Sequence, residues 1–406
     1  MSTATASNDT QAYNYCALPL ASFATRPDQS KGRIHHEDES ATRTCFQRDR
    51  DRIIHSSAFR RLKYKTQVFI YHEGDHYRTR LTHTLEVAQI TRTLARALYV
   101  NEDLAEAIAL AHDLGHTPFA HLGEYALQDC MEPYAGFDHN DQSLRCLTHL
   151  ENKYPKWRGL NLTWETLEGV VKHNGPYSKK PLPETLADVQ KHFDLRLDTY
   201  ASIEAQVAAL SDDIAYNNHD VEDGLRAGLF TLDDIAAVPL LGRHIAAARK
   251  NYPDISEKIL VQEVIREMIG DMVSDVLAET RKRLAADKIS TPEDVRMAGR
   301  AMVAFSKEME DDVNLLREFL FARMYRHSSL NRLKYKVSRI LTELFEAFMD
   351  APDMLPENWQ ERLVESGGAE NEMKKARIIC DYIAGMTDRY AIREHEDIFK
   401  VALDVR

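Results

Sequence analysis

Residues 109–124 read ALAHDLGHTPFAHLGE, and within this run an imidazole and a carboxylate occupy adjacent positions, His112 and Asp113. Apolar residues recur every three or four positions from 104 to 111, so we expect His112 in the last turn of an amphipathic helix that Gly115 ends. Two adjacent polar side chains converge on one metal ion only where the backbone is held firmly. A His–Asp pair alone is common by chance, so its meaning depends on the rest of the chain.

The second half of this run predicts the start of another helix. Thr117 followed by Pro118 is typical of an N-cap and a first helical residue. His121 and Glu124, three positions apart, would then share one face of that helix. The junction between the two predicted helices therefore holds four groups that bind metals or transfer protons: His112, Asp113, His121 and Glu124.

Composition excludes several classes of protein. The chain has 406 residues, of which 44% are hydrophobic, and no stretch approaches the about 18 uninterrupted apolar residues that a membrane span needs. No basic-then-apolar signal sequence is apparent, so we expect a cytoplasmic protein without membrane contact. A formal net charge of −12 argues against extended nucleic-acid binding. The five cysteines form no Cys-x-x-Cys pair, which argues against zinc fingers and a disulfide scaffold.

The first 60 or so residues divide into two parts. Residues up to Glu39 are polar and weakly periodic, so we expect an extended, partly disordered arm. From Arg43 to Lys65, basic residues alternate with apolar ones as on an amphipathic helix whose polar side is basic. That basic side either pairs with acidic neighbours in the protein or binds a small polyanion, and the pattern leaves both open.

Helical patterns dominate the rest of the chain. The one strand-like stretch is Thr66–Tyr71, which alternates and is rich in β-branched and aromatic residues. The run 80–98 has a broad apolar face and carries His83. A later predicted helix stops at an Asn-Gly-Pro sequence, which leaves Lys172 and His173 at its end.

A second informative helix is predicted between about 199 and 227. Asp212, Tyr216 and Asp220 fall at i, i+4 and i+8, and they drift only about 80° around a helix of about 100° per residue. A carboxylate, a phenol and a second carboxylate would therefore line one face. A solvated polar stripe explains such a pattern equally well until the rest of the site is considered.

Two imidazoles and two carboxylates form the candidate metal site, namely His83, His112, Asp113 and Asp212. Mixed nitrogen and oxygen ligands suit Mn²⁺, Mg²⁺, Fe²⁺, Ni²⁺ or Zn²⁺ and leave positions open for water and substrate. The order His, His-Asp, Asp resembles the signature of the HD-domain metal-dependent phosphohydrolases. No Gly-rich phosphate loop and no His-Glu-x-x-His motif occurs in the sequence.

Longer motifs extend the resemblance to one family, the bacterial deoxyguanosinetriphosphate triphosphohydrolase-like proteins. They span nearly the whole chain after the N-terminal arm, and the run Asp381–Tyr390 resembles the phosphohydrolase-associated region of the same proteins. The matching stretches are FQRDRDRIIHSSAFRRL (46–62), KTQVF (65–69), RLTH (80–83), HDLGHTPF (112–119), FDHN (137–140) and DDIAY (212–216).

The resemblance implies hydrolysis of a deoxynucleoside triphosphate to a deoxynucleoside and inorganic triphosphate. His121 would act as the general acid or base and Glu124 would fix its tautomer. The cationic groups near the site would neutralise the triphosphate, His139 would line the phosphate side, and Gln67 would contact the base or sugar. The implied substrate-binding residues are Gln67, Arg80, His116, His139, Lys172, His173, Tyr216 and Asp220, with the last two on the 3′-hydroxyl side of the sugar.

We therefore expect an all-α fold in three parts. Residues 1–60 would form the arm and basic segment, 61–227 the HD phosphohydrolase core, and 228–406 a helical associated region wrapped around it. By family analogy we expect a homo-oligomer, a tetramer or hexamer, and a nucleotide effector is compatible with the resemblance.

Two other functions remain open at this stage. An HD-type deoxynucleoside monophosphatase would use the same metal but fewer cationic groups. A nucleotide-sensing regulator with weak activity would carry a degenerate site, yet all four predicted ligands and His121 are present.

Overall fold

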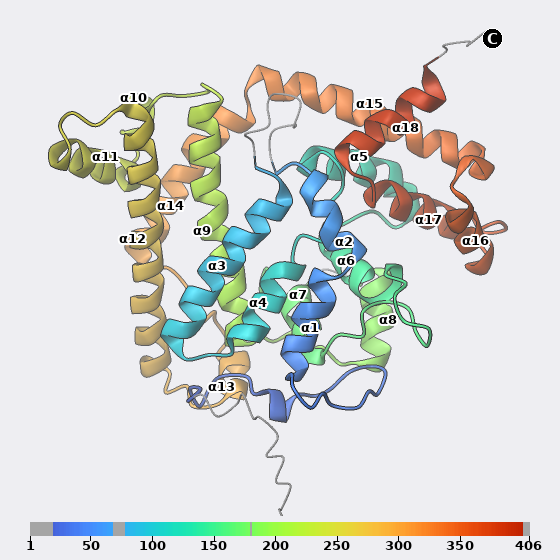
Figure 1. The fold of residues 1–406 in the computed structure, drawn as a ribbon, viewed down its shortest axis with the longest axis horizontal. Helices are drawn as coiled ribbons and strands as arrows, with labels where there is room; N and C mark the ends of the chain where they lie inside the picture. Colours follow the sequence, from blue (N-terminus) through green and yellow to red (C-terminus); the bar gives the residue numbers. More distant parts are fainter. Residues whose placement is uncertain (1–18, 68–77, 179–180, 401–406) are drawn as a thin grey trace, which may run out of the picture.

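The structure, a computed structural model, describes residues 19–67, 78–178 and 181–400. All regular secondary structure within these ranges is helical, which confirms the predicted all-α class (Figure 1). Of the predicted strand at 66–71, Thr66 forms an isolated antiparallel bridge with Thr79, and residues 68–71 lie outside the described ranges.

The α-helices follow one another along the chain with short 3₁₀ and π-helical turns between some of them. They are α1 (Cys45–Ile54), α2 (Ser57–Arg61), α3 (Arg80–Leu98), α4 (Glu102–Ala111), α5 (Ala120–Met131), α6 (His139–Arg145), α7 (Trp164–Val171), α8 (Glu184–His192), α9 (Ile203–Arg226), α10 (Leu232–Ile235), α11 (Pro239–Asn251), α12 (Glu257–Ala286), α13 (Pro292–Met297), α14 (Lys307–Leu320), α15 (Ser328–Asp350), α16 (Glu357–Glu365), α17 (Glu372–Ala384) and α18 (Asp388–Phe399).

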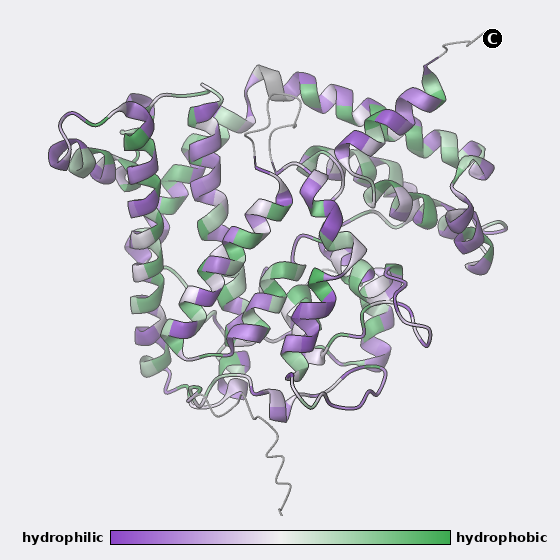
Figure 2. Ribbon diagram, viewed as in Figure 1, coloured by the Kyte–Doolittle hydropathy of each residue, from purple (hydrophilic) through white to green (hydrophobic). Residues whose placement is uncertain are grey.

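Helices α3, α4 and α9 pack against one another at the centre of the molecule (Figure 1). Helix α4 begins at the Asn101 cap, whose side chain accepts from the backbone N–H of Leu104. Seven of its ten residues are buried, so α4 is covered on most sides rather than along one stripe. Hydrophobic residues predominate in α4 and α7, whereas the peripheral helices α11 and α12 contain both hydrophobic and hydrophilic residues (Figure 2). The predicted helix end is confirmed, because α4 stops at Ala111 and His112 is its C-cap.

The predicted start of the next helix is wrong by a few residues. Helix α5 begins at Ala120, because Phe119 and Ala120 adopt left-handed φ values of 64° and 56° that interrupt the turn after Pro118. Thr117 does not cap a backbone N–H, and its hydroxyl instead donates to the carbonyl of Ala120. His121 still lies one turn before Glu124, because both fall within α5.

The N-terminal arm packs against the core where the structure describes it. Residues 19–39 contain only one short 3₁₀ turn, Pro27–Gln29, as expected for an extended segment. However, Ala24 is buried and the Thr25 backbone N–H donates to the buried carboxylate of Glu204 on α9. Specific hydrogen bonds therefore fix this part of the arm to the core, and residues 1–18 of the predicted arm lie outside the described ranges.

The C-terminal helices belong to two hydrophobic clusters. Helices α12 and α14 extend the central cluster, where Met268 and Val313 are buried. Helices α15 and α17 form a second cluster with α5, in which Leu127 packs among residues such as Phe348 and Ile379. Helix α5, which carries His121, is thus buried mainly by the C-terminal part of the chain. Within the described ranges, no helix is long and apolar enough to cross a membrane.

Candidate active site

Three helices bring the four predicted metal ligands together. His83 comes from the first turn of α3, His112 and Asp113 follow α4, and Asp212 lies in the middle of α9. The Nε2 atom of His83 lies 2.9 Å from Oδ1 of Asp212, and the same oxygen lies 3.6 Å from Nε2 of His112. Oδ1 of Asp113 lies 3.3 Å from Nε2 of His112. Each of the four residues therefore offers a donor atom to one small volume.

The hydrogen bonding of His112 fits a metal ligand. Its Nδ1 lies 2.6 Å from the carbonyl of Ala109, which only accepts, so Nδ1 carries the proton. Nε2 then presents a lone pair, and this buried atom has no hydrogen-bond partner in the described part of the chain. An orphaned nitrogen beside two carboxylates is the arrangement that a divalent cation satisfies.

His219 and Glu86 orient the ring of His83, and the sequence analysis missed both residues. Nδ1 of His83 lies 3.1 Å from Nδ1 of His219, whose Nε2 lies 2.5 Å from the carboxylate of Glu86. Burial lowers the pKa of His219 to about 4, so its neutral ring donates to Glu86 and accepts from His83. This leaves the Nε2 lone pair of His83 facing Asp212. His219 lies seven positions after Asp212 on α9, and that helical spacing was the available signal.

Both candidate carboxylate ligands are ionised. Burial opposes the charge of Asp113, yet the Arg80 guanidinium, together with a hydrogen bond from His116, holds its pKa well below the usual range. Burial opposes ionisation of Asp212 in the same way, and neighbouring imidazoles, His112 first, hold its pKa well below the usual range. Deprotonated oxygens are the form that binds a metal ion.

Arg80 is the cation nearest to the ligand cluster. It is 1% exposed, and its Nη1 donates to Oδ2 of Asp113 at 2.8 Å. Nε and Nη2 are buried without a hydrogen-bond partner among the described residues. Two free donors of a buried guanidinium beside a metal site fit the oxygens of a phosphate.

His116 contributes a hydrogen-bonding group rather than a charge. Burial and the positive charge of Arg80 hold its pKa well below the usual range, so its imidazole is neutral. Its Nε2 lies 3.2 Å from Asp113, and its ring stacks on that of His139 with centroids 4.1 Å apart. As a neutral ring, His116 would contact a substrate through hydrogen bonds and stacking rather than through charge.

Glu124 connects two histidines, as the predicted role of this carboxylate requires. One oxygen lies 3.2 Å from Nδ1 of His121 and the other 2.6 Å from Nδ1 of His139. Burial opposes ionisation of Glu124, but hydrogen bonds from both imidazoles hold its pKa far below the usual range. The side chain of His121 is 44% exposed, so its Nε2 is available to a substrate. Donor atoms of His116, Glu124 and His139 also lie within 4.8 Å of one another.

Lys172 and His173 occupy different environments. The ammonium of Lys172 is buried and bonds to Glu168 at 3.0 Å and to the Thr199 hydroxyl at 2.9 Å. These bonds occupy the ammonium, although Lys172 lines one cavity together with His173 and Asp212. His173 reaches the ligand cluster, because its Nε2 lies 3.3 Å from Oδ2 of Asp212 and its ring stacks on His112.

The predicted polar face of α9 meets a residue that the sequence analysis missed. The hydroxyl of Tyr325, from the π-helical turn Phe321–Tyr325, lies 2.5 Å from the Tyr216 hydroxyl and donates to Asp220. Tyr325 follows α14, more than a hundred residues after Tyr216. The run around Tyr325 showed a polar-aromatic pattern, but nothing in its spacing linked it to α9.

A cavity of about 500 Å³ opens beside these groups and is distinct from the ligand cluster. Gln67, His121 and Tyr216 line it, so it collects three of the predicted site residues. The carbonyl oxygen of the Gln67 side chain is buried without a partner in the described ranges. Arg326 and Lys334 add positive charge to its lining.

Residues from the C-terminal region hold the loop between α4 and α5. Asp388 accepts the backbone N–H of Phe119 at 2.9 Å with one oxygen, and the N–H and hydroxyl of Thr66 with the other. Lys65 donates from a fully buried position to the carbonyls of His116 and Ala384. The unusual backbone at Phe119 therefore depends on α18.

Asp220 makes the stability of the fold depend on pH. Burial raises its pKa to about 8, against about 3.9 in an unfolded chain, so between these values the folded form holds one extra proton. Stability therefore falls as pH rises through this window, at up to about 1.4 kcal/mol per pH unit.

We expect Asp220→Asn to leave the melting temperature near pH 4 unchanged and to raise it by several degrees near pH 8. Asparagine keeps the shape of the protonated acid but cannot ionise. Differential scanning calorimetry at both pH values measures this, with exposed Asp254→Asn as the control that should shift neither. A gain at pH 4 as large as that at pH 8 would contradict the assignment.

Comparisons with known proteins agree with this geometry. The family model of the HD domain matches residues 80–217, and that of the phosphohydrolase-associated domain matches residues 303–397. A protein from Caulobacter sp. (strain K31), named deoxyguanosinetriphosphate triphosphohydrolase-like protein, is 55% identical over 387 residues, covering 95% of this chain and 97% of the relative. Proteins of the same name from Parvibaculum lavamentivorans and Bradyrhizobium diazoefficiens are 54% and 50% identical, covering 93% and 96% of this chain and 96% and 99% of their own lengths.

Proposed function

The chain belongs to the deoxyguanosinetriphosphate triphosphohydrolase-like family of HD-domain phosphohydrolases, and from this premise we propose that it hydrolyses deoxynucleoside triphosphates to deoxynucleoside and inorganic triphosphate. The observation that carries the proposal is Arg80. Its two unpartnered, buried donors lie beside the candidate metal ligands, where a phosphate chain would satisfy them.

A divalent metal ion held by His83, His112, Asp113 and Asp212 would polarise the phosphate nearest the sugar and lower the pKa of a bound water. Arg80 would bind phosphate oxygens through Nε and Nη2 while it keeps its bond to Asp113. The stacked rings of His116 and His139 would border the phosphate chain without adding charge at His116.

His121 would move the proton. Its Nδ1–H donates to Glu124, which leaves Nε2 free to accept a proton from water or, once protonated, to donate one to the departing 5′ oxygen. Glu124 remains ionised and therefore stabilises the protonated imidazole. His139, on the other oxygen of Glu124, keeps that carboxylate in place.

The cavity lined by Gln67, Tyr216 and Tyr325 would hold the nucleoside. Tyr216 and Asp220 lie one turn apart on α9 and share the hydroxyl of Tyr325, so they would border the sugar. Gln67 would offer its unpartnered side-chain carbonyl oxygen to the base or sugar. His173, in contact with Asp212, stays a candidate for phosphate contact, whereas Lys172 is withdrawn from this role because Glu168 and Thr199 hold its ammonium.

The test is product analysis. The purified chain is incubated with each deoxynucleoside triphosphate and with the monophosphates, in Mn²⁺ or Mg²⁺. We expect intact triphosphate and deoxynucleoside from the triphosphates. Orthophosphate from the monophosphates would instead support a deoxynucleoside monophosphatase, and binding without turnover would support a regulator.

We expect Tyr216→Ala to narrow the preference for deoxynucleoside over ribonucleoside triphosphates and to leave metal content unchanged. A 2′-hydroxyl beside the Tyr216 ring would clash or remain an unsatisfied buried donor, which costs about 1–3 kcal/mol. The ratio of kcat/KM for dGTP and GTP measures the preference. Tyr216→Phe, which keeps the ring, is the matched variant and should retain most of it. An unaltered ratio in Tyr216→Ala would remove Tyr216 from the sugar pocket.

A further inference from the structure

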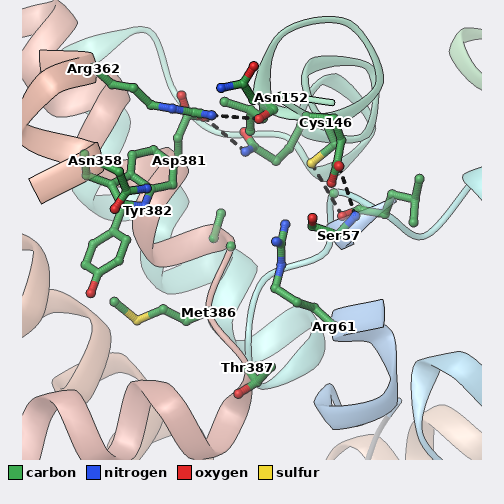
Figure 3. A pocket seen from close by; sticks show the side chains of 18 of the residues that line it. Ser57, Arg61, Cys146, Asn152, Asn358, Arg362, Asp381, Tyr382, Met386 and Thr387 are labelled. Atoms are coloured by element: carbon green, nitrogen blue, oxygen red, sulfur yellow. Dashed lines mark hydrogen bonds between the residues drawn. The ribbon is translucent and has the colours of Figure 1, made fainter. Parts of the chain in front are cut away.

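A second cavity, of about 470 Å³, lies between the HD core and the C-terminal helices (Figure 3). None of the residues proposed above to bind metal or substrate lines it. Its walls come from α2, from the segments around Leu114 and Leu150, and from α16, α17 and α18. The cavity is therefore a separate space that exists only where the two regions meet.

Arg61 enters this cavity without a counter-charge. The arginines of α1 pair with carboxylates, for example Arg50 with Asp103 and Arg52 with Glu37, which is the first of the two possibilities left open for the basic segment. Arg61 forms no ion pair or hydrogen bond within the described ranges, and its Nε is buried without a partner. In Figure 3 its side chain extends toward the middle of the cavity and no dashed line reaches it.

Arg362, from α16, supplies a second guanidinium in the same lining. It donates to the carbonyl of Leu150 at 2.8 Å, but no carboxylate lies within 4.0 Å of it among the described residues. Burial and the nearby charge of Arg158 lower the pKa of Arg362, which is the effect of a cation without a neutralising partner. Its guanidinium lies 4.9 Å from the ring centroid of Trp359.

The acidic groups in the lining are already engaged. Asp381 is fully buried and pairs with Arg145 at 2.8 Å and with Arg377 at 2.9 Å. Glu151 accepts the backbone N–H groups of Ser57 and Ala58 at the start of α2. Neither carboxylate forms an ion pair with Arg61 or Arg362, so both guanidiniums keep N–H donors free for a ligand.

We propose that this cavity, the Arg61–Arg362 cavity, binds the phosphate group of a small phosphorylated ligand. Two guanidiniums without carboxylate partners provide several N–H donors, the arrangement that recognises phosphate oxygens. Trp359 and Tyr382, with ring centroids 5.4 Å apart, border the same cavity and offer apolar surface to a planar group. A nucleotide and an inorganic phosphate chain share this phosphate chemistry.

A ligand bound in this cavity would contact residues that directly follow a candidate metal ligand in the sequence. Leu114 and Gly115 line the cavity, and Asp113 precedes them directly. Gly115 is packed so closely on α6 that a side chain there would overlap the backbone of Ser143 and His139. A ligand pressing on this segment would therefore bear on the residues that surround the metal.

Calorimetric titration of the metal-loaded full chain with inorganic triphosphate tests the proposal by counting sites. We expect two equivalents bound, one in the candidate active site and one in the Arg61–Arg362 cavity. Arg61→Gln and Arg362→Gln should weaken the second by at least tenfold. Arg60→Gln is the matched control on the same helix, because Arg60 is exposed and, unlike Arg61, does not line the cavity. The proposal would be overturned if neither Arg61→Gln nor Arg362→Gln weakened any of the equivalents that the wild-type chain binds.

Competition identifies the ligand. Stronger displacement of triphosphate from this second site by a deoxynucleoside monophosphate than by orthophosphate would identify a nucleotide, and equal displacement an inorganic phosphate. Displacement by a deoxynucleoside lacking phosphate would contradict the proposal. Of the two expected triphosphate molecules, only the one in the candidate active site depends on the proposed function. Failure of that function would remove turnover and leave the Arg61-dependent equivalent in place.

Discussion

His112→Ala is expected to abolish both metal binding and turnover. His112 gives its Nε2 lone pair to the cluster, so its loss removes one of the four candidate ligands and leaves the carboxylates of Asp113 and Asp212 with one metal-binding neighbour fewer. Loss of a hydrogen-bond partner behind a metal ligand already costs roughly 10–100-fold in affinity or activity, and loss of a ligand costs more. Asp113→Ala should have the same effect.

The measurement is metal content by elemental analysis after dialysis, together with turnover at saturating Mn²⁺. Circular dichroism establishes that each variant is folded. His192→Ala, at an exposed histidine on α8, is the control and should retain both metal and rate. A folded His112→Ala chain that keeps a full equivalent of metal would refute the ligand set.

His121→Ala should keep the metal and lose most of its turnover. His121 does not contact the four predicted ligands in the structure; it bonds to Glu124 and stands beside the rings of His116 and His139. Proton transfer by a positioned side chain contributes roughly 10²–10⁴-fold to rate, so kcat should fall by that factor. Glu124→Gln, which removes only the charge behind the imidazole, should cost less.

The two effects separate in one experiment, in which kcat and metal content are measured for the wild type, His121→Ala and Glu124→Gln. Loss of metal from His121→Ala with a normal rate restored by excess Mn²⁺ would reverse the assigned roles. The pH dependence of kcat adds a second readout. The part of the wild-type profile that is due to His121 should be absent from His121→Ala.

Local spacing was sufficient to predict much of this molecule. The apolar periodicity before His112 located the end of α4, and the i, i+4 and i+8 positions of Asp212, Tyr216 and Asp220 placed them on one face of α9. Both inferences depend only on the spacing of residues along a single helix, and that spacing can be counted in the sequence.

Contacts between distant segments could not be predicted in the same way. Tyr325 joins Tyr216 and Asp220 from a π-helical turn after α14, and no periodicity connects the two elements. Lys172 looked available at a helix end, but the tertiary fold places Glu168 and Thr199 around its ammonium. The Thr117–Pro118 start signal failed because Asp388 holds Phe119 in a left-handed conformation that no local propensity favours.

The bond between Asp388 and Phe119 has a consequence for synthesis of the protein. A ribosome must add 269 further residues after Phe119 before this carboxylate exists, and the chain emerges from its N-terminus first. The candidate metal ligands His83, His112, Asp113 and Asp212 are all translated earlier, so a nascent chain can bring them together while the backbone at Phe119 is still free. We therefore expect the proposed site to be completed only late in translation, once α18 has emerged and Asp388 binds the loop.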